Sequence, residues 1–407
     1  MIEQEKEKKM INDSRRGFLK SAAIGSALVV GAEMSPIAAA FADEIPKVTY
    51  TGGYKAGTAV QELELLDLVE IEQRAAKVIP KGGFGYIAGG AGDEWTLREN
   101  RAAFERKQIT PRVLTGKGAV DLRAEILGIS IASPIIVCPM GGQGLAHVTA
   151  EAGMAMGAAA GNTIMALSTV STLSMEQVAA AAGGPKWFQL YLQTDDGVNR
   201  DLLRRAKAAG YKAIVLTVDS TATGNREADA RNNFTFPLPF GNLVGKGSGG
   251  NIHALNASFA QKIDAKAIEF VLTESGLPVI VKGISSPDDA LLAIRAGASA
   301  IQISNHGGRQ LDGSPATFTV LPAVAKAVDR KVPIILDSGI RRGQDVFKAL
   351  ASGADIVGLG RPAYYGLALG GWKGVHSVLK FLNRELSMVM QLAGAQTVED
   401  IKRTNLA

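Results

Sequence analysis

The sequence from residue 300 to residue 312 reads AIQISNHGGRQLD and joins a structural signal to a chemical one. The apolar run at 300–303 predicts a short buried strand, which stops at a polar turn containing two glycines. In that turn, His306 can move a proton near neutral pH, and Arg309 has a planar fork that fits a carboxylate. The pair indicates a small organic acid as substrate. This stretch alone leaves open an ordinary surface turn with two polar residues.

Seven more short apolar runs repeat the pattern along the chain. The eight predicted strands are 135–139, 163–167, 186–191, 213–218, 278–281, 300–303, 333–336 and 355–359. Most are separated by segments of helical composition, at 150–160, 175–182, 198–209, 287–296, 318–327 and 343–351. Strands that alternate with helices imply right-handed parallel crossovers. Eight such units predict an α/β fold, a (β/α)8 TIM barrel rather than an open sheet.

Other segments flank or interrupt the predicted barrel domain, which we place at residues 63–407. Residues 43–62 form a polar N-terminal arm that we expect to be loose. Helical spacing at 63–78 predicts a helix, followed by a flexible glycine-rich turn at 82–94 and a second helix at about 95–104. The long stretch 221–258, rich in Gly, Asn and Pro, predicts an active-site lid after the fourth strand.

The first 42 residues have the features of an export signal. Residues 14–20 read SRRGFLK and match the twin-arginine pattern. The apolar segment at 21–32 is too short to span a bilayer, and Ala40-Phe41-Ala42 has the small-x-small form of a cleavage site. We therefore expect a twin-arginine signal peptide, a mature chain that begins near Asp43, and a periplasmic protein. An uncleaved basic arm with an apolar anchor is the alternative.

Composition excludes several classes of partner and chemistry. The chain has 407 residues and a formal charge of +5, spread without a basic block, which gives a nucleic-acid partner little support. We expect no metal site and no integral membrane segment in the mature chain. Cys138, the single cysteine, cannot form an internal disulfide, and its apolar surroundings favour core packing over a nucleophilic role. A nicotinamide-dependent dehydrogenase is disfavoured because no G-x-G-x-x-G joins a strand to a helix.

Polar side chains stand where the predicted strands end, the edge at which TIM barrels carry their active sites. In chain order they are Ser168, Gln189, Tyr191, Thr217, Asp219, Arg226, Lys282, His306, Arg309, Asp337, Arg341 and Arg361. A barrel that only had to be stable would not need so many polar groups at one mouth. Glycines and arginines after the last two strands, Arg341 and Arg361 in particular, predict an anchor for a cofactor phosphate.

Several motifs resemble the FMN-dependent α-hydroxy-acid oxidase and dehydrogenase family, and within it the lactate oxidases. They are SNHGGRQLD at 304–312, DSGIRRG at 337–343, IAG at 87–89, GDEWT at 92–96, WFQ at 187–189 and LALGGW at 367–372. The resemblance covers about residues 60–405. It implies tightly bound FMN, oxidation of an L-2-hydroxy acid to the 2-oxo acid, and a homotetramer or octamer.

The resemblance also implies a role for each polar residue. His306 would be the base that takes a proton, from the α-carbon or the hydroxyl, and Asp219 would orient it. Arg309 and Arg226 would clamp the substrate carboxylate, with Tyr86 assisting and Tyr191 bonding near the hydroxyl. Lys282 would sit at the N1/C2 edge of the flavin and favour its anionic reduced form. The implied cofactor-binding set is Pro139, Met140, Gly141, Ser168, Gln189, Thr217, Lys282, Ser304, Asp337, Gly339, Arg341, Gly360 and Arg361.

Two departures from the family pattern bear on the substrate. Val170 stands where relatives place an aromatic residue over the substrate. The lid has FGNLVGKG at 240–247 in the region where relatives carry a tyrosine that closes over lactate. Together with Gly141, these changes predict a roomier or less polar pocket. Longer or branched 2-hydroxy acids therefore join lactate as candidate substrates.

The electron acceptor is left open by the residues. Oxygen, giving hydrogen peroxide, is the expected acceptor because the lid has no long apolar insertion suited to membrane contact. A dehydrogenase that uses a quinone or a cytochrome and a monooxygenase that decarboxylates its product are alternatives within the family. A non-catalytic flavin-binding barrel is an alternative of another class. The complete set of His306, Asp219, Arg226 and Arg309 argues against it.

Overall fold

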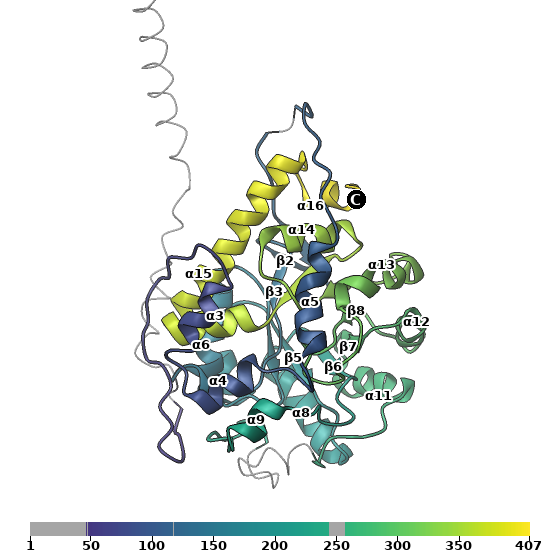
Figure 1. The fold of residues 1–407 in the computed structure, drawn as a ribbon. Helices are drawn as coiled ribbons and strands as arrows, with labels where there is room; N and C mark the ends of the chain where they lie inside the picture. Colours follow the sequence, from purple (N-terminus) through teal and green to yellow (C-terminus); the bar gives the residue numbers. More distant parts are fainter. Residues whose placement is uncertain (1–45, 47, 117, 244–256) are drawn as a thin grey trace, which may run out of the picture. The chain divides into compact units, whose positions relative to one another are not determined.

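The computed structural model describes residues 46, 48–116, 118–243 and 257–407. Eight parallel strands close into one barrel, in the order β10-β3-β4-β5-β6-β7-β8-β9 (Figure 1). They are β3 (Ile135–Val137), β4 (Met165–Ser168), β5 (Lys186–Leu190), β6 (Ile214–Thr217), β7 (Val279–Ile284), β8 (Ala300–Ile303), β9 (Ile334–Leu336) and β10 (Ile356–Leu359). Each predicted strand has its counterpart, so the TIM barrel is confirmed.

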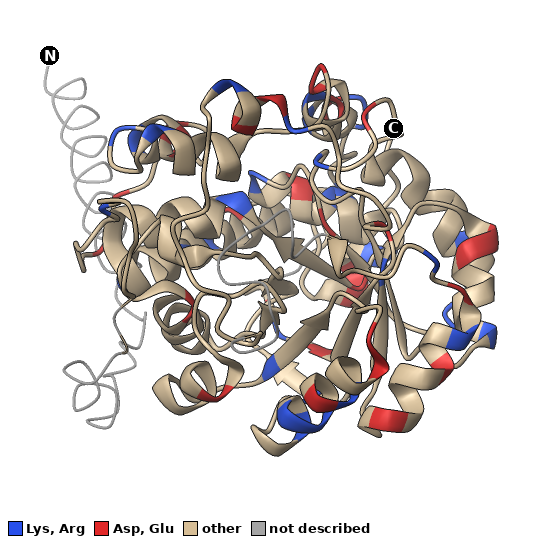
Figure 2. Ribbon diagram, turned by 90° about the horizontal axis from the view of Figure 1, so that it is seen from below, with Lys and Arg blue, Asp and Glu red and all other residues tan. Residues whose placement is uncertain are grey.

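Helices surround the barrel (Figure 2). They are α6 (Ala150–Ala160), α7 (Met175–Ala181), α8 (Asp196–Ala208), α11 (Ala265–Ser275), α12 (Pro287–Arg295), α13 (Thr317–Val328), α14 (Gly343–Ala351) and α15 (Arg361–Ala393). The six predicted helices are present to within two residues at either end. Helix α15 contains a kink at Gly370 and Gly371. Gly371 has φ +57°, a backbone conformation that glycine adopts without strain. A short helix, α16 (Val398–Lys402), follows it.

Side-chain alternation along the strands builds two layers inside the barrel. The lower layer is apolar and consists of Ile136, Ala166, Trp187, Val215, Ile280, Ala300, Ile335 and Ile356. The hairpin of β1 (Ala124–Ile126) and β2 (Ile129–Ile131) packs Ile126 and Ile131 against this layer. Two residues further along each strand, the inward positions are Cys138, Ser168, Gln189, Thr217, Lys282, Gln302, Asp337 and Gly358. We call these eight residues the upper ring, and it forms the floor of the barrel mouth.

Two predictions about the N-terminal part were wrong. The helix expected at 63–78 is only α3 (Glu70–Ala75), because Asp67 Oδ1 accepts from Val69 N and Glu70 N at 2.7 and 2.6 Å and starts the helix there. The turn expected at 82–94 is largely α4 (Lys81–Ala88), and α5 (Trp95–Glu105) follows as predicted.

The glycines that suggested flexibility in α4 serve close packing instead. A Cβ at Gly82 would lie 2.6 Å from the Phe234 ring, and one at Gly83 would collide with the Tyr54 hydroxyl. These glycines therefore let Phe234 and Tyr54 pack directly against the backbone of α4. Since these neighbours come from the arm and the lid, the local sequence does not reveal them.

The described part of the arm is packed rather than loose, contrary to expectation. Its backbone bonds to the loop after β3 through Val48 N to Val148 O and Gly57 N to Ala146 O, both 3.0 Å. The hydroxyls of Tyr50 and Tyr54 donate to carbonyls of the same loop at 2.8 Å. That loop contains the short η1 helix (Gln143–Leu145) and begins with the residues expected to face the flavin.

Other sequence predictions fall partly outside the described residues. The predicted signal peptide at 1–42, residues 43–45 and 47 of the arm, and residues 244–256 of the predicted lid belong to this group. The described start of the lid holds α9 (Glu227–Arg231) and buries Phe236, Leu238, Phe240 and Leu243. In the described residues, no helix combines the length and apolarity needed to cross a membrane. Figure 2 shows charged residues of both signs distributed around the outer helices.

Candidate active site

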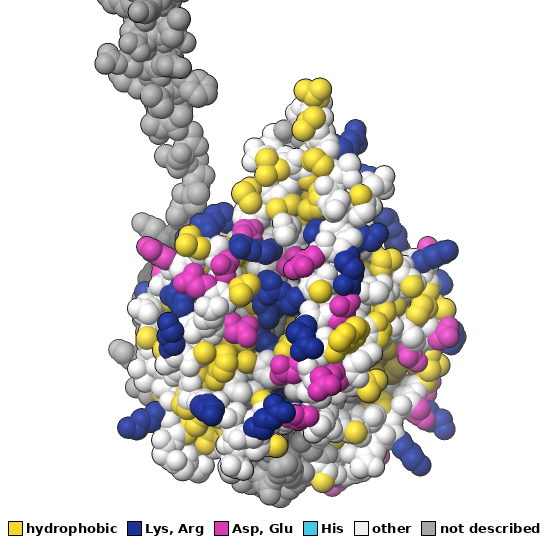
Figure 3. All heavy atoms as spheres, viewed as in Figure 1, with side chains coloured by type: hydrophobic (Ala, Val, Ile, Leu, Met, Phe, Trp, Pro, Cys, Tyr) yellow, Lys and Arg dark blue, Asp and Glu magenta, His cyan; other side chains and the backbone are white. Residues whose placement is uncertain are grey.

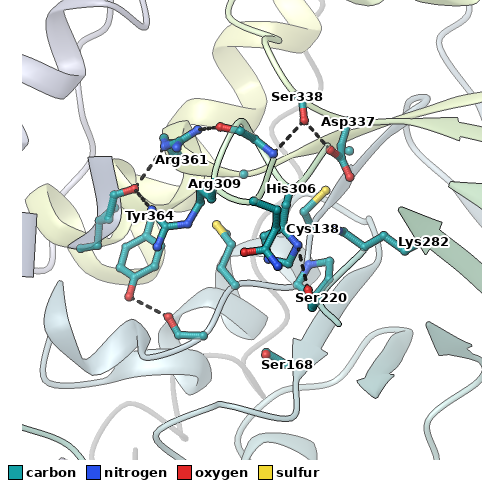
Figure 4. Close-up of a pocket in the computed structure, with 18 of the residues that line it drawn as sticks. Cys138, Ser168, Ser220, Lys282, His306, Arg309, Asp337, Ser338, Arg361 and Tyr364 are labelled. Atoms are coloured by element: carbon teal, nitrogen blue, oxygen red, sulfur yellow. Dashed lines mark hydrogen bonds between the residues drawn. The ribbon is translucent and has the colours of Figure 1, made fainter. Parts of the chain in front are cut away.

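His306 is one of the residues that line a pocket at the mouth of the barrel (Figure 4), and it lies between two side chains that follow β5 and β6. Its Nδ1 lies 3.1 Å from Asp219 Oδ1, and its Nε2 lies 3.2 Å from the Tyr191 hydroxyl. The residue has φ +58°, a left-handed conformation that is uncommon outside glycine. One ring nitrogen is thus held by a carboxylate, while the other meets a hydroxyl on the cavity side.

The charges around His306 favour its neutral form. Burial and the nearby Lys282 ammonium lower the pKa of His306 below its ordinary value of 6.5, although Asp219 opposes them. Burial disfavours the charged form of Asp219, yet Lys282 and His306 lower the pKa of Asp219 to about 2. Burial raises the pKa of Tyr191 to about 12, so its hydroxyl stays protonated. At neutral pH the site therefore has a neutral imidazole held by an ionised carboxylate, as a general base requires.

The catalytic loop is anchored by residues that the quoted sequence contains but to which the sequence analysis gave no role. Asn305 and Asn100 of α5 exchange amide hydrogen bonds at 2.8 and 2.9 Å. Gln310 donates to Asp219 O and Ala222 O, both at 3.0 Å, and so joins this loop to the start of the lid. Asp312 Oδ1 accepts from Thr96 N at 2.8 Å at the start of α5. These contacts hold His306 and Arg309 in fixed positions.

Four arginines surround the other side of the cavity: Arg226, Arg309, Arg341 and Arg361. In the part of the chain that the structure describes, none of them forms an ion pair with a carboxylate. Burial, with the neighbouring charges of Arg226 and Arg361, lowers the pKa of Arg309 to about 9. Burial also lowers the pKa of Arg341 to about 10. Cations crowded in this way would be stabilised by anionic ligands.

Arg309 and Arg361 donate to backbone carbonyls, most of them near the end of α4. Arg309 Nη1 donates to Gly89 O at 2.8 Å, and Arg361 Nη2 donates to the same oxygen at 3.0 Å. Arg361 Nη1 donates to Gly307 O at 3.0 Å (Figure 4). The Tyr86 ring lies 5.1 Å from the Arg309 guanidinium and 5.8 Å from that of Arg226, so it packs beside both.

The upper ring is connected by hydrogen bonds. Ser168 Oγ donates to Gln189 Oε1, and Gln189 Nε2 donates to Thr217 Oγ1, both at 2.9 Å. On the opposite side, Asp337 accepts from Ser304 Oγ at 2.9 Å and from Ser338 Oγ at 2.7 Å. At Gly283, which has φ +111°, β7 approaches Asp219 closely. A Cβ at this position would lie 2.7 Å from Asp219 Cβ, so only glycine fits.

Most of the predicted site residues line one cavity. They are Tyr86, Pro139, Met140, Gly141, Ser168, Tyr191, Arg226, Lys282, His306, Arg309, Asp337, Gly339, Arg341, Gly360 and Arg361. Three others lie just behind and bond to residues of the lining: Asp219, Gln189 and Ser304. Thr217 accepts a hydrogen bond from Gln189 and is joined to the lining through it. The structure thus brings the whole predicted set together, while the role of each residue remains a prediction.

The residues present fit FMN. The upper ring offers hydrogen-bonding groups to a polar ring system, and Gly339, Arg341, Gly360 and Arg361 line the same cavity toward the start of α15. Arg341 Nε is buried and has no hydrogen-bond partner among the described residues, which marks a donor suited to a phosphate oxygen. In the same residues, no group of three or more His, Cys, Asp or Glu side chains is placed to hold a metal ion.

The sequence analysis missed two residues next to the catalytic pair: Phe259, which contacts Tyr191, and Ser220, which lies beside His306. The Phe259 ring stacks on the Tyr191 ring at 4.8 Å, and Tyr191 in turn lies nearly parallel to His306. Ser220 Oγ lies 3.5 Å from His306 Nδ1. An isolated aromatic residue at the end of a long lid has no local pattern, so no sequence signal pointed to Phe259. Ser220 follows Asp219 directly in the sequence, so its place next to the predicted catalytic carboxylate could have been used to predict that it lies in the site.

Comparison with known proteins places this site in context. A family model described as FMN-dependent dehydrogenase matches residues 75–407. The chain is 54% identical over 359 residues to an L-lactate oxidase of Lentilactobacillus hilgardii, across 87% of this chain and 97% of that protein. It is 42% identical over 356 residues to a glycolate oxidase of Spinacia oleracea, across 85% of this chain and 96% of that protein.

Solved structures agree with these relatives. A crystal structure of a Pediococcus acidilactici protein described as a lactate oxidase superposes with a TM-score of 0.84 at 52% identity, covering 87% of this chain and 98% of that one. A mandelate oxidase structure superposes with a TM-score of 0.80 at 37% identity, covering 84% of this chain and 99% of that one.

Proposed function

The chain belongs to the FMN-dependent dehydrogenase family, and on this premise we propose that it oxidises an L-2-hydroxy acid to the 2-oxo acid with oxygen as electron acceptor. The substrate is lactate or a somewhat larger acid, and the second product is hydrogen peroxide. The observation that carries the proposal is the oriented neutral imidazole of His306, which shares a cavity with arginines that lack carboxylate partners.

Each residue has a task that follows from its geometry. Bound FMN supplies the acceptor for two electrons. Arg309 and Arg226 hold the substrate carboxylate, and the Tyr86 ring packs beside both guanidinium groups. Tyr191 bonds near the substrate hydroxyl, and His306 takes the proton on Nε2. The carboxylate of Asp219 stabilises the imidazolium that forms, because the two groups are 3.1 Å apart.

The test is anaerobic mixing of the yellow holoenzyme with L-2-hydroxy acids, followed by air. We expect the visible flavin band to bleach, then to return with one hydrogen peroxide and one 2-oxo acid per cycle. A band that returns only with a quinone or cytochrome would instead identify a dehydrogenase. Decarboxylated acid in place of the 2-oxo acid would identify a monooxygenase. Protein that stays yellow with every acid would favour a non-catalytic flavin-binding barrel.

The wall formed by Gly141 and Val170 predicts a broad substrate range. A Cβ at Gly141 would lie 3.1 Å from Val170 O and 3.2 Å from Val170 Cβ, so an alanine at this position would press on Val170 and disturb the wall. We expect 2-hydroxybutyrate, 2-hydroxy-4-methylpentanoate and mandelate to reach kcat/KM values within about tenfold of lactate, whereas a pocket fitted closely to lactate would discriminate by roughly 10–200-fold for one methylene. In Gly141→Ala, the larger acids should lose most. A strong preference of the wild type for lactate would contradict this expectation.

We further propose twin-arginine export to the periplasm, supported by SRRGFLK at 14–20. The Arg15→Lys, Arg16→Lys double variant should stay in the cytoplasm on cell fractionation, whereas the wild type should not. Equal distribution of the two would contradict export by this route.

We also propose a homotetramer or octamer. Its support is an exposed apolar cluster at the C-terminal end of α15, where yellow side chains gather in Figure 3. The cluster consists of Val113, Leu114, Met388 and Leu392, which are 53–102% exposed. Size-exclusion chromatography with light scattering measures the molar mass of the holoenzyme, and the mass of a monomer would refute the proposal.

A further inference from the structure

One side chain of the upper ring has no role in the flavin site described above. Gln302 is only 1% exposed and points into the barrel between the apolar lower layer and the cavity. Its Nε2 donates to Asp337 Oδ2 at 2.7 Å and lies 3.7 Å from Cys138 Sγ. A buried amide is costly unless it is hydrogen-bonded, so the bond to Asp337 accounts for a glutamine at this position.

The two oxygens of Asp337 are held by different residues. Oδ1 accepts from the hydroxyls of Ser304 and Ser338. Oδ2 accepts a hydrogen bond from Gln302, and the Cys138 thiol also lies against the Asp337 carboxylate. The Asp337 backbone is fixed by Thr317 Oγ1, which donates to Asp337 O at 2.6 Å. Loss of the Gln302 bond would therefore free one carboxylate oxygen without releasing the backbone.

A cation that attracts the Asp337 carboxylate is the buried ammonium of Lys282, which is two strands away in the ring. Burial opposes the charge of Lys282, but Asp219 and Asp337 together raise the pKa of Lys282 above its ordinary value. Within the described residues, its Nζ makes no hydrogen bond to the protein, so its donors are available to a ligand above the ring. Two carboxylates thus act on one ammonium.

We propose that Gln302 is a positioning residue: by donating to Asp337 Oδ2, it keeps this carboxylate from turning onto Lys282. The Lys282 charge then stays directed at the flavin ring, where negative charge develops during reduction. This inference rests on FMN lying above the upper ring, as in the proposed function. It concerns how a buried amide sets the electrostatics of the flavin, not which acid is oxidised.

Sulfite measures this effect directly. It adds to oxidised flavin and leaves negative charge at the N1/C2 edge of the ring, so its affinity reports the positive charge there. Gln302→Met keeps the length of the side chain but removes the N–H donor. In this holoenzyme, at saturating FMN, we expect the sulfite Kd to rise about tenfold, in line with the loss of a hydrogen bond to a charged group.

Ile301→Val is the matched control. Ile301 is fully buried on the same strand, but its side chain packs with the helix-facing core, so the variant reports general loosening of β8. Its sulfite Kd should stay within about twofold of wild type. An unchanged sulfite Kd in Gln302→Met, or an equal rise in both variants, would overturn the proposal. A weaker FMN Kd with unchanged sulfite affinity would likewise show a merely structural glutamine.

Gln302→Glu provides a second test, by the same sulfite titration, if the methionine variant fails to fold. Asp337 and Cys138 lie against this position, and Lys282 is paired with it on the neighbouring strand β7. A protonated glutamic acid can donate to Asp337 as glutamine does, whereas an ionised one repels Asp337 toward Lys282. The sulfite Kd relative to wild type should therefore rise with pH, and a constant ratio would overturn the proposal. Because sulfite needs no hydroxy acid, failure of the proposed oxidation would appear separately, as wild-type flavin that never bleaches.

Discussion

His306→Ala should retain its FMN and lose nearly all reduction of the flavin by hydroxy acids. A positioned general base contributes about 10²–10⁴-fold, and we expect a loss near the upper end because no other described group bonds Nε2 except Tyr191, whose hydroxyl stays protonated. The measurement is the rate of anaerobic bleaching in a stopped-flow spectrometer, with the FMN content determined on the same sample. Normal FMN content with slow bleaching is the expected pair of results.

The backbone at His306 calls for a second variant. Its φ of +58° is unfavourable for alanine, whereas asparagine tolerates this conformation. His306→Asn therefore preserves the loop but cannot accept the proton, and it should be as slow as His306→Ala. Added imidazole should partly restore bleaching in the alanine variant only. Protein that has lost its FMN in both variants would mean that the histidine is structural, and rapid bleaching would mean that it is not the base.

The barrel and its polar mouth were predictable because both follow from local, periodic signals. Runs such as 300–303 are apolar, of strand length and followed by turn residues, and the structure has β8 at those residues. Parallel strands bring their carboxyl ends to one edge, so Asp219 and His306, 87 residues apart, could be placed together before any coordinates. Alternation along the strands then decides which side chains face the interior.

Contacts between distant segments were not predictable in the same way. The glycines of α4 indicated a flexible turn, because their packing partners, Phe234 and Tyr54, lie far away in the sequence. Phe259 forms a backbone bridge with Gln193, and this places its ring on Tyr191. No periodic pattern in the sequence predicts such a bridge. Gln302 was visible as a polar residue in an apolar strand. The role of Gln302 depends on the side-chain rotamer of Asp337, because that rotamer places Oδ2 within reach of the amide, and only the folded barrel defines it.

Asp219→Asn should slow flavin reduction by roughly 10³-fold, because the imidazolium that forms on His306 loses its ionic partner. Asparagine has nearly the same shape, which matters where Gly283 leaves little room around Asp219. Substrate KM should change little, since Asp219 stands behind His306 and does not line the cavity. Rate constants for bleaching, measured against hydroxy-acid concentration, separate the two effects.

The pH dependence distinguishes this electrostatic role from general damage to the site. In the wild type, burial and Lys282 lower the pKa of His306, so the base form is lost only as pH falls below the ordinary histidine range. Asp219 opposes that shift, and its removal lowers the pKa of His306 further. The acid limb of kcat/KM in Asp219→Asn should therefore move to lower pH while the plateau falls. A lower plateau with the limb unchanged, or moved upward, would mean that Asp219 does not act through the charge of His306.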